Sequence, residues 1–243
     1  MSDLKNLVID AHGGVDRWNR LSNFRAHLLV GGQLWPLKKQ DGIISDTMVL
    51  VELHRQFVSH YDFANYGLRT CFTADRVAIE TTSGQIVAER TNPRTAFHGH
   101  VQETPWDWLH LAYFAGYAIW NYITTPFSFA KADYLSEELE PWSEKGQTWR
   151  RLKVTFPAHI ATHCAEQVFY FDSDGLLRRH DYIPEVLGTG PFAHSAAHYS
   201  SEYQEFDEIT VPTRRRVYPV DHDGNVAKEP FIVTIDLDRI TFS

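Results

Sequence analysis

The segment TPWDWLHLAYFAGYAIWNYITTPF, residues 104–127, constrains the fold more than any other part of the chain. It carries eight aromatic side chains in twenty-four positions. Its beginning is typical of a helix start, with Thr104 as N-cap and Asp107 as the acid of a capping box. Pro126 ends it, because proline cannot continue the hydrogen-bond ladder and disfavours helix at the preceding residue. The sequence predicts a helix over residues 105–124.

The predicted helix is apolar around its whole circumference, which is typical of a helix buried inside protein. Its length of about 30 Å would also match a lipid bilayer. However, Asp107, His110 and Asn121 interrupt the apolar run, so the segment falls short of a spanning candidate. We therefore predict no membrane span and expect a curved sheet to enclose the helix.

The segments on either side of this helix are typical of β-strands. Runs of β-branched and aromatic residues, interrupted by Gly and Asp-Gly turns, occupy residues 24–100 and 130–243. Short helices are expected over residues 3–22. Strands and helices do not alternate, and neither a phosphate-binding Gly-rich loop nor a nucleophile elbow occurs, which disfavours a parallel sheet, nucleotide binding and serine-hydrolase chemistry. The sequence predicts a mainly β (α+β) fold with a curved antiparallel sheet, in a single domain over residues 1–243.

Charge and cysteine content limit the partners and the compartment. The chain has 31 acidic and 23 basic residues and a formal net charge of -8, which disfavours nucleic acid and anionic membrane surfaces as partners. Cys71 and Cys164 are too few for a disulfide framework and indicate free thiols. Because the N-terminus lacks the pattern of a secretory signal, we expect a cytoplasmic protein with a small-molecule partner; the oligomeric state stays open.

One stripe of the predicted helix carries large amphipathic side chains. Trp106, Tyr113, Tyr117 and Trp120 recur at steps of three, four and seven residues, and each polar tip needs a hydrogen-bond partner when it is buried. The stripe either borders a ligand cavity or belongs to the core, with its polar tips bonded to backbone carbonyls. We predict that these four residues bind ligand, with His110 as a polar contributor.

The hairpin QVFYFDSDGLLRRHDYI supplies a second candidate surface. If Asp174 and Gly175 form a two-residue loop, alternation along the two strands gathers aromatic and polar side chains on one face. That face collects Gln167, Phe169, Phe171, Arg178, His180 and Tyr182. Such a face is typical of a ligand cavity, or of a sheet interior in which the arginine and histidine pair or extend to solvent. A three-residue loop would change the pairing.

Histidine pairs, Asp-Gly loops and an arginine run invite further hypotheses. The thirteen histidines include the pairs His98 and His100, His159 and His163, and His194 and His198. None has the helical context of a metal motif, and the DSDG and DHDG segments lack the glutamate of a calcium loop. We therefore predict no metal and no cofactor. Arg214, Arg215 and Arg216 alternate sides of a strand, so we expect solvated or carboxylate-paired side chains rather than a basic patch.

Several of these segments carry a resemblance to known proteins. AHGG after the first helix, WDWLHLAYFAGYAIWNYITTPF, LKVTFP, YFDSDGLLRRHDY and the closing VPTRRRVYP and EPFIVTIDLDRITF resemble an uncharacterised bacterial protein family of about this length. The terminal patterns are also similar to the LolA/LppX-like lipoprotein carriers. The resemblance implies a half-barrel, in which a strongly curved antiparallel sheet closed by helices surrounds an apolar cavity. It does not imply lipoprotein transport, because fold does not transmit function.

Two functions remain for a protein that surrounds an apolar cavity in this way, which we call a container. The first is binding of a small hydrophobic or aromatic molecule between the 105–124 helix and the concave sheet, with Phe169 and Phe171 as further ligand contacts. The alternative is a cofactor-independent enzyme that performs acid–base chemistry, as an isomerase, a dehydratase or lyase, or a cyclase. For that case we predict His180 as acid or base, Tyr182 as its hydrogen-bonding partner, and Arg178 as the group that holds a carboxylate or oxyanion.

Overall fold

A computed structural model describes residues 3–64, 67–190, 194–221, 225–227 and 229–243. The first part of the chain forms α1 (Asp3–Ala11), α2 (Val15–Trp18), β1 (Asn23–Gly31), α3 (Leu34–Leu37), β2 (Asp46–Glu52), β3 (Phe57–His60), β4 (Leu68–Phe72), β5 (Arg76–Thr81), β6 (Ile86–Thr91) and the 3-10 helix η1 (Pro93–Phe97). The second part forms α4 (Trp108–Thr124), η2 (Phe127–Ala130), β7 (Leu135–Glu144), β8 (Gln147–Thr155), β9 (Glu166–Phe171), β10 (Leu177–Tyr182), η3 (Glu185–Leu187), β11 (Ala196–Phe206), β12 (Ile209–Pro219) and β13 (Val233–Phe242).

The described strands form one continuous antiparallel sheet of thirteen strands in the order β6-β5-β4-β3-β2-β1-β13-β12-β11-β10-β9-β8-β7. Each half of the chain is a meander, and the first and last strands pair at the centre. In the described part of the chain the sheet does not close, because β6 and β7 are its two edges. The mainly β, half-barrel prediction is confirmed.

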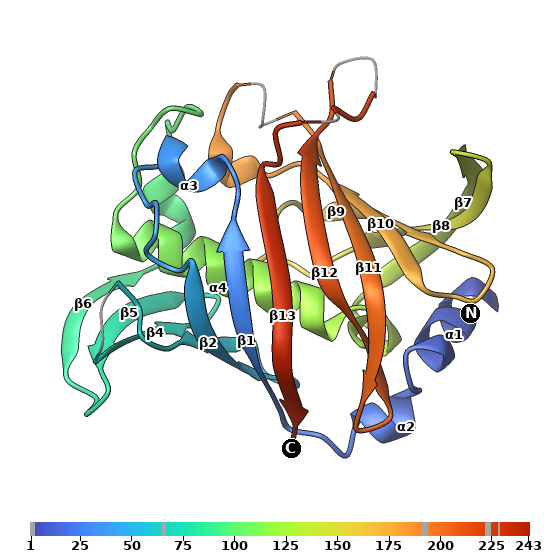
Figure 1. Cartoon of the computed structure of the whole chain (residues 1–243), viewed down its shortest axis with the longest axis horizontal. Coiled ribbons are helices and arrows are strands. Elements are labelled where there is room, and N and C mark those ends of the chain that lie inside the picture. The colour runs from blue at the N-terminus through green and yellow to red at the C-terminus, as the bar shows by residue number, and fades with distance from the viewer. Residues whose placement is uncertain (1–2, 65–66, 191–193, 222–224, 228) are drawn as a thin grey trace.

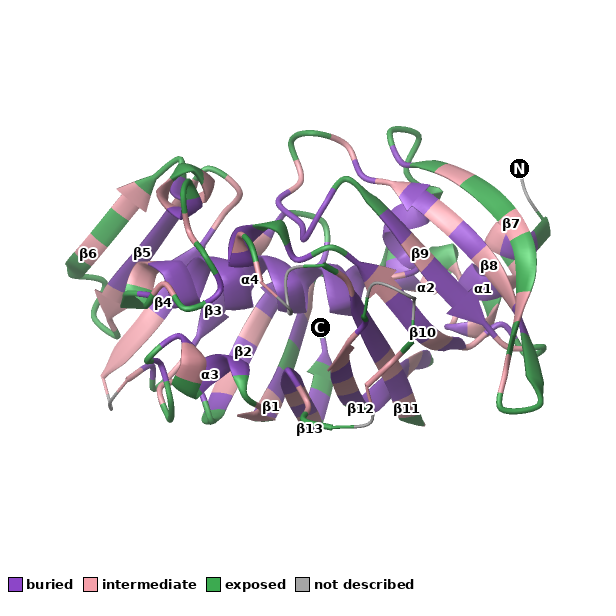
Figure 2. Ribbon diagram, turned by 90° about the horizontal axis from the view of Figure 1, so that it is seen from above, coloured by how far each residue is buried: buried purple, intermediate pink, exposed green. Residues whose placement is uncertain are grey.

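This topology places α4 inside the curve of the sheet. The helix connects the half that ends at edge strand β6 to the half that begins at edge strand β7, so it must cross the sheet from one side to the other. Figure 1 shows it running across the strands, and Figure 2 shows that nearly all of it is buried within the curve of the sheet. Its seventeen residues span about 26 Å at 1.5 Å per residue.

The helix begins three residues later than the sequence predicts. Asp107, not Thr104, is the N-cap: its carboxylate accepts from the backbone N–H of His110 at 2.8 Å, and the His110 ring accepts from the N–H of Asp107. The box therefore uses His110 at the N3 position, which the usual Glu or Gln pattern does not include. The C-terminal end at Thr124 is as predicted.

Helix α4 packs most closely on strands β2–β6. Gly116 allows the closest approach, because a Cβ atom there would lie 2.4 Å from Cγ of Phe72 on β4. The opposite side of the helix faces β11–β13, whose backbones lie farther from it. A second apolar cluster lies at the other end of the sheet, between α1, η2 and strands β8–β10, and includes Leu4, Val8, Phe129 and Phe169.

Candidate functional site

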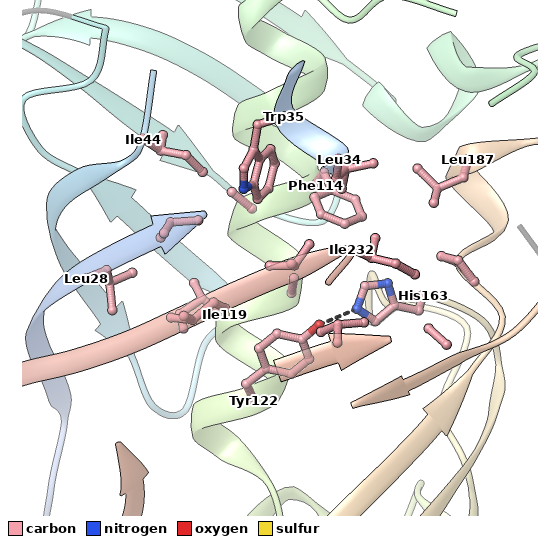
Figure 3. A pocket seen from close by; sticks show the side chains of 18 of the residues that line it. Leu28, Leu34, Trp35, Ile44, Phe114, Ile119, Tyr122, His163, Leu187 and Ile232 are labelled. Carbon is pink, nitrogen blue, oxygen red and sulfur yellow. Dashed lines mark hydrogen bonds between the residues drawn. The ribbon is translucent and has the colours of Figure 1, made fainter. Parts of the chain in front are cut away.

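An apolar cavity lies between α4 and the centre of the sheet (Figure 3). Helix α4 contributes Phe114, Ala118, Tyr122 and their neighbours, which recur at four-residue spacing and so share one face of the helix. The opposite wall comes from β1, α3, β12 and β13, and includes Leu28, Leu34, Trp35, Val217, Val233 and Ile235. The cavity has a volume of about 40 Å³, room for water-sized molecules only.

The polar edge of this cavity is a hydrogen-bonded group of two tyrosines and a histidine. The Tyr122 hydroxyl lies 2.9 Å from Nε2 of His163 and 3.1 Å from the Tyr182 hydroxyl. The His163 ring also stacks on the Tyr182 ring, with centroids 3.9 Å apart. All three side chains line the cavity, so the apolar space has a few convergent polar groups at one side, as ligand sites commonly do.

The ionisable groups of this edge are held in their neutral forms. Burial, reinforced by the charge of Arg94, lowers the pKa of His163 well below its ordinary value. Burial also raises the pKa of Tyr122 to about 12, although the hydrogen bond with Tyr182 opposes this shift. At neutral pH the cavity edge is therefore polar but uncharged.

His180 and Tyr182 lie on the inner face of β10, as the alternation of the hairpin predicts. Tyr182 lines the cavity. His180 lies beside it without lining the cavity: its Nε2 is 2.6 Å from Oε1 of Gln167, and its ring stacks on Phe169 at 4.1 Å. Burial, with the charges of His163 and Arg215, lowers the pKa of His180 well below its ordinary value.

Arg178 does not join this group, and here the predicted pairing is wrong. His180 pairs with Phe169 as predicted, but Phe171 pairs with Leu177 because the register shifts between Leu177 and Arg179. The loop is also longer than two residues, since the hairpin strands end at Phe171 and begin at Leu177. Arg178 turns outward, where its Nε donates to the Asp172 carboxylate at 2.6 Å.

Phe171 and Phe169 belong to the second apolar cluster rather than to the cavity. Phe169 contacts Phe129 of η2 on one side and His180 on the other. Phe171 is fully buried in the same cluster. Neither side chain lines the cavity, so their predicted contact with ligand has no geometric support at this site.

The aromatic stripe of α4 faces a different direction from the cavity. None of its four members lines this cavity, which takes the adjacent face of the helix, and their contact with ligand stays a prediction. Tyr117 comes nearest, with its hydroxyl 3.4 Å from Nδ1 of His163. The Trp120 indole donates to the carbonyls of Glu52 and Arg55, an arrangement typical of a core residue whose polar tip is satisfied by backbone.

The N-terminal members of the predicted site lie farther from the cavity, Trp106 just before α4 and His110 in its first turn. Trp106 packs against Phe97 and Phe114, with the Lys38 ammonium 5.1 Å from its ring. His110 is occupied by the capping box, and its ring contacts Phe97. His110 lies at the N-terminal end of α4, whereas His180 and Tyr182, on β10, lie near Tyr122 toward the C-terminal end. The structure therefore does not bring His110 to them.

Tyr113 borders a separate, more open cleft with a volume of about 650 Å³. This cleft lies between η1 and the loop after β8, and Arg94, Phe156 and His159 are among its lining residues. Arg94 is held there by the Glu185 carboxylate at 2.5 Å and by the Thr162 carbonyl at 2.7 Å. The cleft is more open than the cavity, and a larger share of its lining is polar.

The histidine pairs do not assemble into a metal site in the described part of the chain, where no group of three or more His, Cys, Asp or Glu side chains could hold an ion. His100 lies near His110 instead of His98, with ring centroids 5.1 Å apart. In the DSDG segment, the Asp172 carboxylate accepts from backbone N–H groups of the turn. The DHDG segment lies largely outside the described residues.

The arginine run alternates sides as predicted, but the expectation of a solvated or carboxylate-paired side chain is wrong for Arg215, which is buried and bonds to Ser200 and the Tyr122 carbonyl. Arg214 and Arg216 pair with carboxylates: Arg214 with Glu202 at 2.6 Å and Arg216 with Asp236 at 2.8 Å. Arg215 points to the opposite, inner face of β12 and is 2% exposed. The sequence gives a signal for this placement, because the alternate positions Val211, Thr213, Arg215 and Val217 are all buried on the inner face.

No protein-family model matches this sequence, and no curated protein matches it either. Among solved structures, a DUF1329 family protein from Desulfovibrio piger superposes with a TM-score of 0.57 at 10% identity, covering 99% of this chain and 92% of that one. A putative outer membrane lipoprotein-sorting protein domain from Vibrio parahaemolyticus gives a TM-score of 0.50 at 10% identity, covering 98% and 92%. The fold is the half-barrel of these proteins. At this identity the likeness shows the fold alone.

A LolA superfamily protein from Nitrosomonas europaea also matches, with a TM-score of 0.49 at 9% identity, covering 93% of this chain and 90% of that chain. The half-barrel that the sequence resemblance implies is confirmed by the Desulfovibrio piger and Vibrio parahaemolyticus superpositions, although no activity transfers with it. In the described residues no helix is long and apolar enough to cross a membrane.

Proposed function

We propose that this protein binds a small hydrophobic or aromatic molecule between α4 and the concave face of the sheet. The observation that carries the proposal is the enclosed, almost entirely apolar cavity whose polar groups gather at one edge, at Tyr122, His163 and Tyr182. Ligand pockets are commonly apolar with a few convergent polar groups. The half-barrel likeness to a lipoprotein-sorting domain is compatible with a container.

Binding requires the cavity to expand, because a ligand pocket commonly needs about 300 Å³ or more and this one measures about 40 Å³. The cavity lies between α4 and the centre of the sheet, where the backbones of β11–β13 are farther from the helix than those of β2–β6, so in this proposal that side opens. Ala115 and Ala118 present the least side-chain bulk on this face of the helix. In this proposal the ligand separates the helix from β12 and β13 while Gly116 stays packed on Phe72.

An apolar fluorescent probe tests the proposal. Trp35 lines the cavity, so a bound probe should quench part of the tryptophan emission in a saturable manner. In the Trp35→Phe variant the probe should no longer cause this quenching. Val217→Phe fills the cavity from β12 and should weaken binding about tenfold or more. Val211→Phe, on the same face of β12 but away from the cavity, is the matched control, since overpacking costs both variants about 1–3 kcal/mol of stability.

Equal affinities of the two phenylalanine variants for the probe would contradict the proposed location. Absence of saturable quenching in the wild type would contradict hydrophobic ligand binding itself. Emission from the other tryptophans provides an internal reference in each titration.

An acid–base enzyme is the second candidate, favoured by the hydrogen bonds that join His163 to Tyr122 at the cavity wall. We rank it second because proton transfer is most effective when the pKa of the catalytic group lies near the working pH. The pKa of His163 lies well below that range and that of Tyr122 at about 12 lies above it. Chemical change of a bound probe, detected by mass spectrometry and lost in His163→Phe, would favour the enzyme.

We place the protein in the cytoplasm as part of this proposal. The buried, unpaired thiols of Cys71 and Cys164 are compatible with a reducing compartment. Cell fractionation with an antibody against the native protein tests the location.

A further inference from the structure

Arg215 is a buried cation beside the cavity. It lies two residues before the cavity-lining Val217 on the inner face of β12 and is 2% exposed. Its guanidinium lies 5.3 Å from the centroid of the Tyr122 ring, which forms part of the cavity wall. The Tyr122 ring therefore lies beside both the guanidinium and the apolar space.

The hydrogen bonds of Arg215 are few and long. Its Nη1 donates to the Ser200 hydroxyl at 3.3 Å and its Nη2 to the Tyr122 carbonyl at 3.1 Å. Its Nε has no hydrogen-bond partner among the described residues. No described Asp or Glu carboxylate forms an ion pair with it, whereas its neighbours Arg214 and Arg216 both have one. A buried guanidinium without a counterion costs several kcal/mol and keeps its charge.

His198 adds a second polar group without a partner at the same place. It is fully buried on β11, beside β12, and neither ring nitrogen has a hydrogen-bond partner among the described residues. Its ring contacts the Tyr122 ring at 4.4 Å and lies 6.0 Å from His180. Arg215 and His198 thus both lie against the Tyr122 ring, and Nε of Arg215 and both ring nitrogens of His198 have hydrogen-bonding capacity that the described residues do not use.

We propose that Arg215 and His198 form the headgroup site for a carboxylate on the apolar ligand. The proposal rests on the proposed function, because the ligand's apolar chain would occupy the cavity lined by Val217. The planar guanidinium matches a carboxylate in a bidentate geometry, and Nε together with one Nη group is available for it. His198 would donate one further hydrogen bond, and Tyr122 would move aside as the cavity expands.

The charge of the site selects a monocarboxylate over a phosphate monoester. Arg215 supplies one positive charge, and burial holds the pKa values of the neighbouring His180 and His198 well below their ordinary value, so both are neutral. One carboxylate neutralises the guanidinium. A phosphate monoester, with a charge of about -1.5 to -2 at neutral pH, would leave excess negative charge buried in an apolar site.

Titrations of the whole protein with dodecanoate, dodecanol and dodecyl phosphate test this site, with tryptophan emission as the readout. We expect dodecanoate to bind about tenfold or more tightly than dodecanol, because a charge-assisted hydrogen bond adds to the apolar contact. Arg215→Met should reduce the affinity for dodecanoate to that for dodecanol and leave dodecanol binding unchanged. Arg216→Met, which removes the outward neighbour paired with Asp236, is the matched control and should keep the preference.

The outcomes separate the headgroup site from the container. Equal binding of dodecanoate and dodecanol by the wild type overturns the headgroup site and leaves the container intact, and tighter binding of dodecyl phosphate overturns the assignment of a carboxylate. No binding of any of the three compounds overturns both proposals. If Arg215→Met fails to fold, the wild-type comparison of dodecanoate with dodecanol decides.

Discussion

Acidification should destabilise this protein steeply, because its interior contains neutral histidines. Burial lowers the pKa of His12 and of His60 from 6.5 to about 4. Below pH 6.5 the unfolded chain binds a proton at each position, while the folded protein does not until the pH reaches about 4. The stabilisation is therefore complete above pH 6.5 and is lost as the pH falls through this window.

The expected loss is large relative to the stability of a typical protein. A shift from 6.5 to about 4 corresponds to about 3 kcal/mol for each of the two histidines, at about 1.4 kcal/mol per pKa unit. His163, His180 and His198, whose pKa values are also lowered by burial, act in the same direction. The total approaches the whole free energy of unfolding, about 5–15 kcal/mol.

One histidine acts in the opposite sense. The pKa of His27 is raised, chiefly by the hydrogen bond with Asp46, so its stabilising contribution is complete below pH 6.5 and is lost as the pH rises through its folded-state value. Because at least five buried histidines oppose it, the net slope between about pH 7 and about pH 5 still favours unfolding in acid.

Urea unfolding followed by tryptophan emission measures this slope between about pH 7 and about pH 5. His60→Gln removes one titrating group and should reduce the slope by up to about 1.4 kcal/mol per pH unit. His159→Gln, in which the replaced side chain is exposed, should leave it unchanged. A free energy of unfolding that stays constant over this range would refute the conclusion that these histidines are buried in the neutral form.

Two substitutions test the packing and charge assignments. Gly116→Ala should destabilise the fold by about 1–3 kcal/mol in urea unfolding, despite the better helix propensity of alanine, because the new Cβ would lie 2.4 Å from Cγ of Phe72; a stabilised variant would contradict the close helix–sheet contact. Arg179→Met should lower the free energy of unfolding by about 3–5 kcal/mol, because the Arg179 guanidinium is held by Asp181 at 2.7 Å and Glu144 at 2.8 Å. Arg215→Met breaks no described ion pair, so its effect on stability should be close to neutral or stabilising. Equal losses for the two arginine variants would indicate that Arg215 has a structural counterion.

Much of the architecture follows from local sequence patterns. The continuous apolar circumference of residues 108–124 requires burial, and the strand blocks on either side leave a curved sheet as the enclosing surface. The start of the helix was predicted less accurately, because His110 takes the capping role that a Glu or Gln usually has.

The cavity depends on long-range pairing that periodicity does not specify. Its wall opposite α4 forms where β1 pairs with β13, and this brings Val30 next to Ile235 across most of the chain length. Two faces of α4 are rich in large side chains. The pairing of the strands determines which of these faces borders the cavity. The Tyr and Trp stripe therefore could not be distinguished from the Phe114–Ala118–Tyr122 face by sequence alone.

The positions of the polar groups also depend on structural details that the sequence pattern does not specify. A register shift between Leu177 and Arg179 turns Arg178 outward, and no residue pattern in the hairpin specifies that shift. An inward arginine is nonetheless present, at Arg215, where strict alternation along β12 places it. The sequence analysis chose Arg178 for the site and expected Arg215 to be solvated or carboxylate-paired, and the structure reverses these two placements.

A crystal structure of the protein with dodecanoate bound tests whether the ligand lies in the cavity between helix and sheet. We expect the hydrocarbon chain between Ala118 of α4 and Val217 of β12, with α4 still packed on β4 through Gly116 and Phe72. Hydrocarbon in the open cleft beside Arg94 and Tyr113, with the cavity still at about 40 Å³, would contradict it.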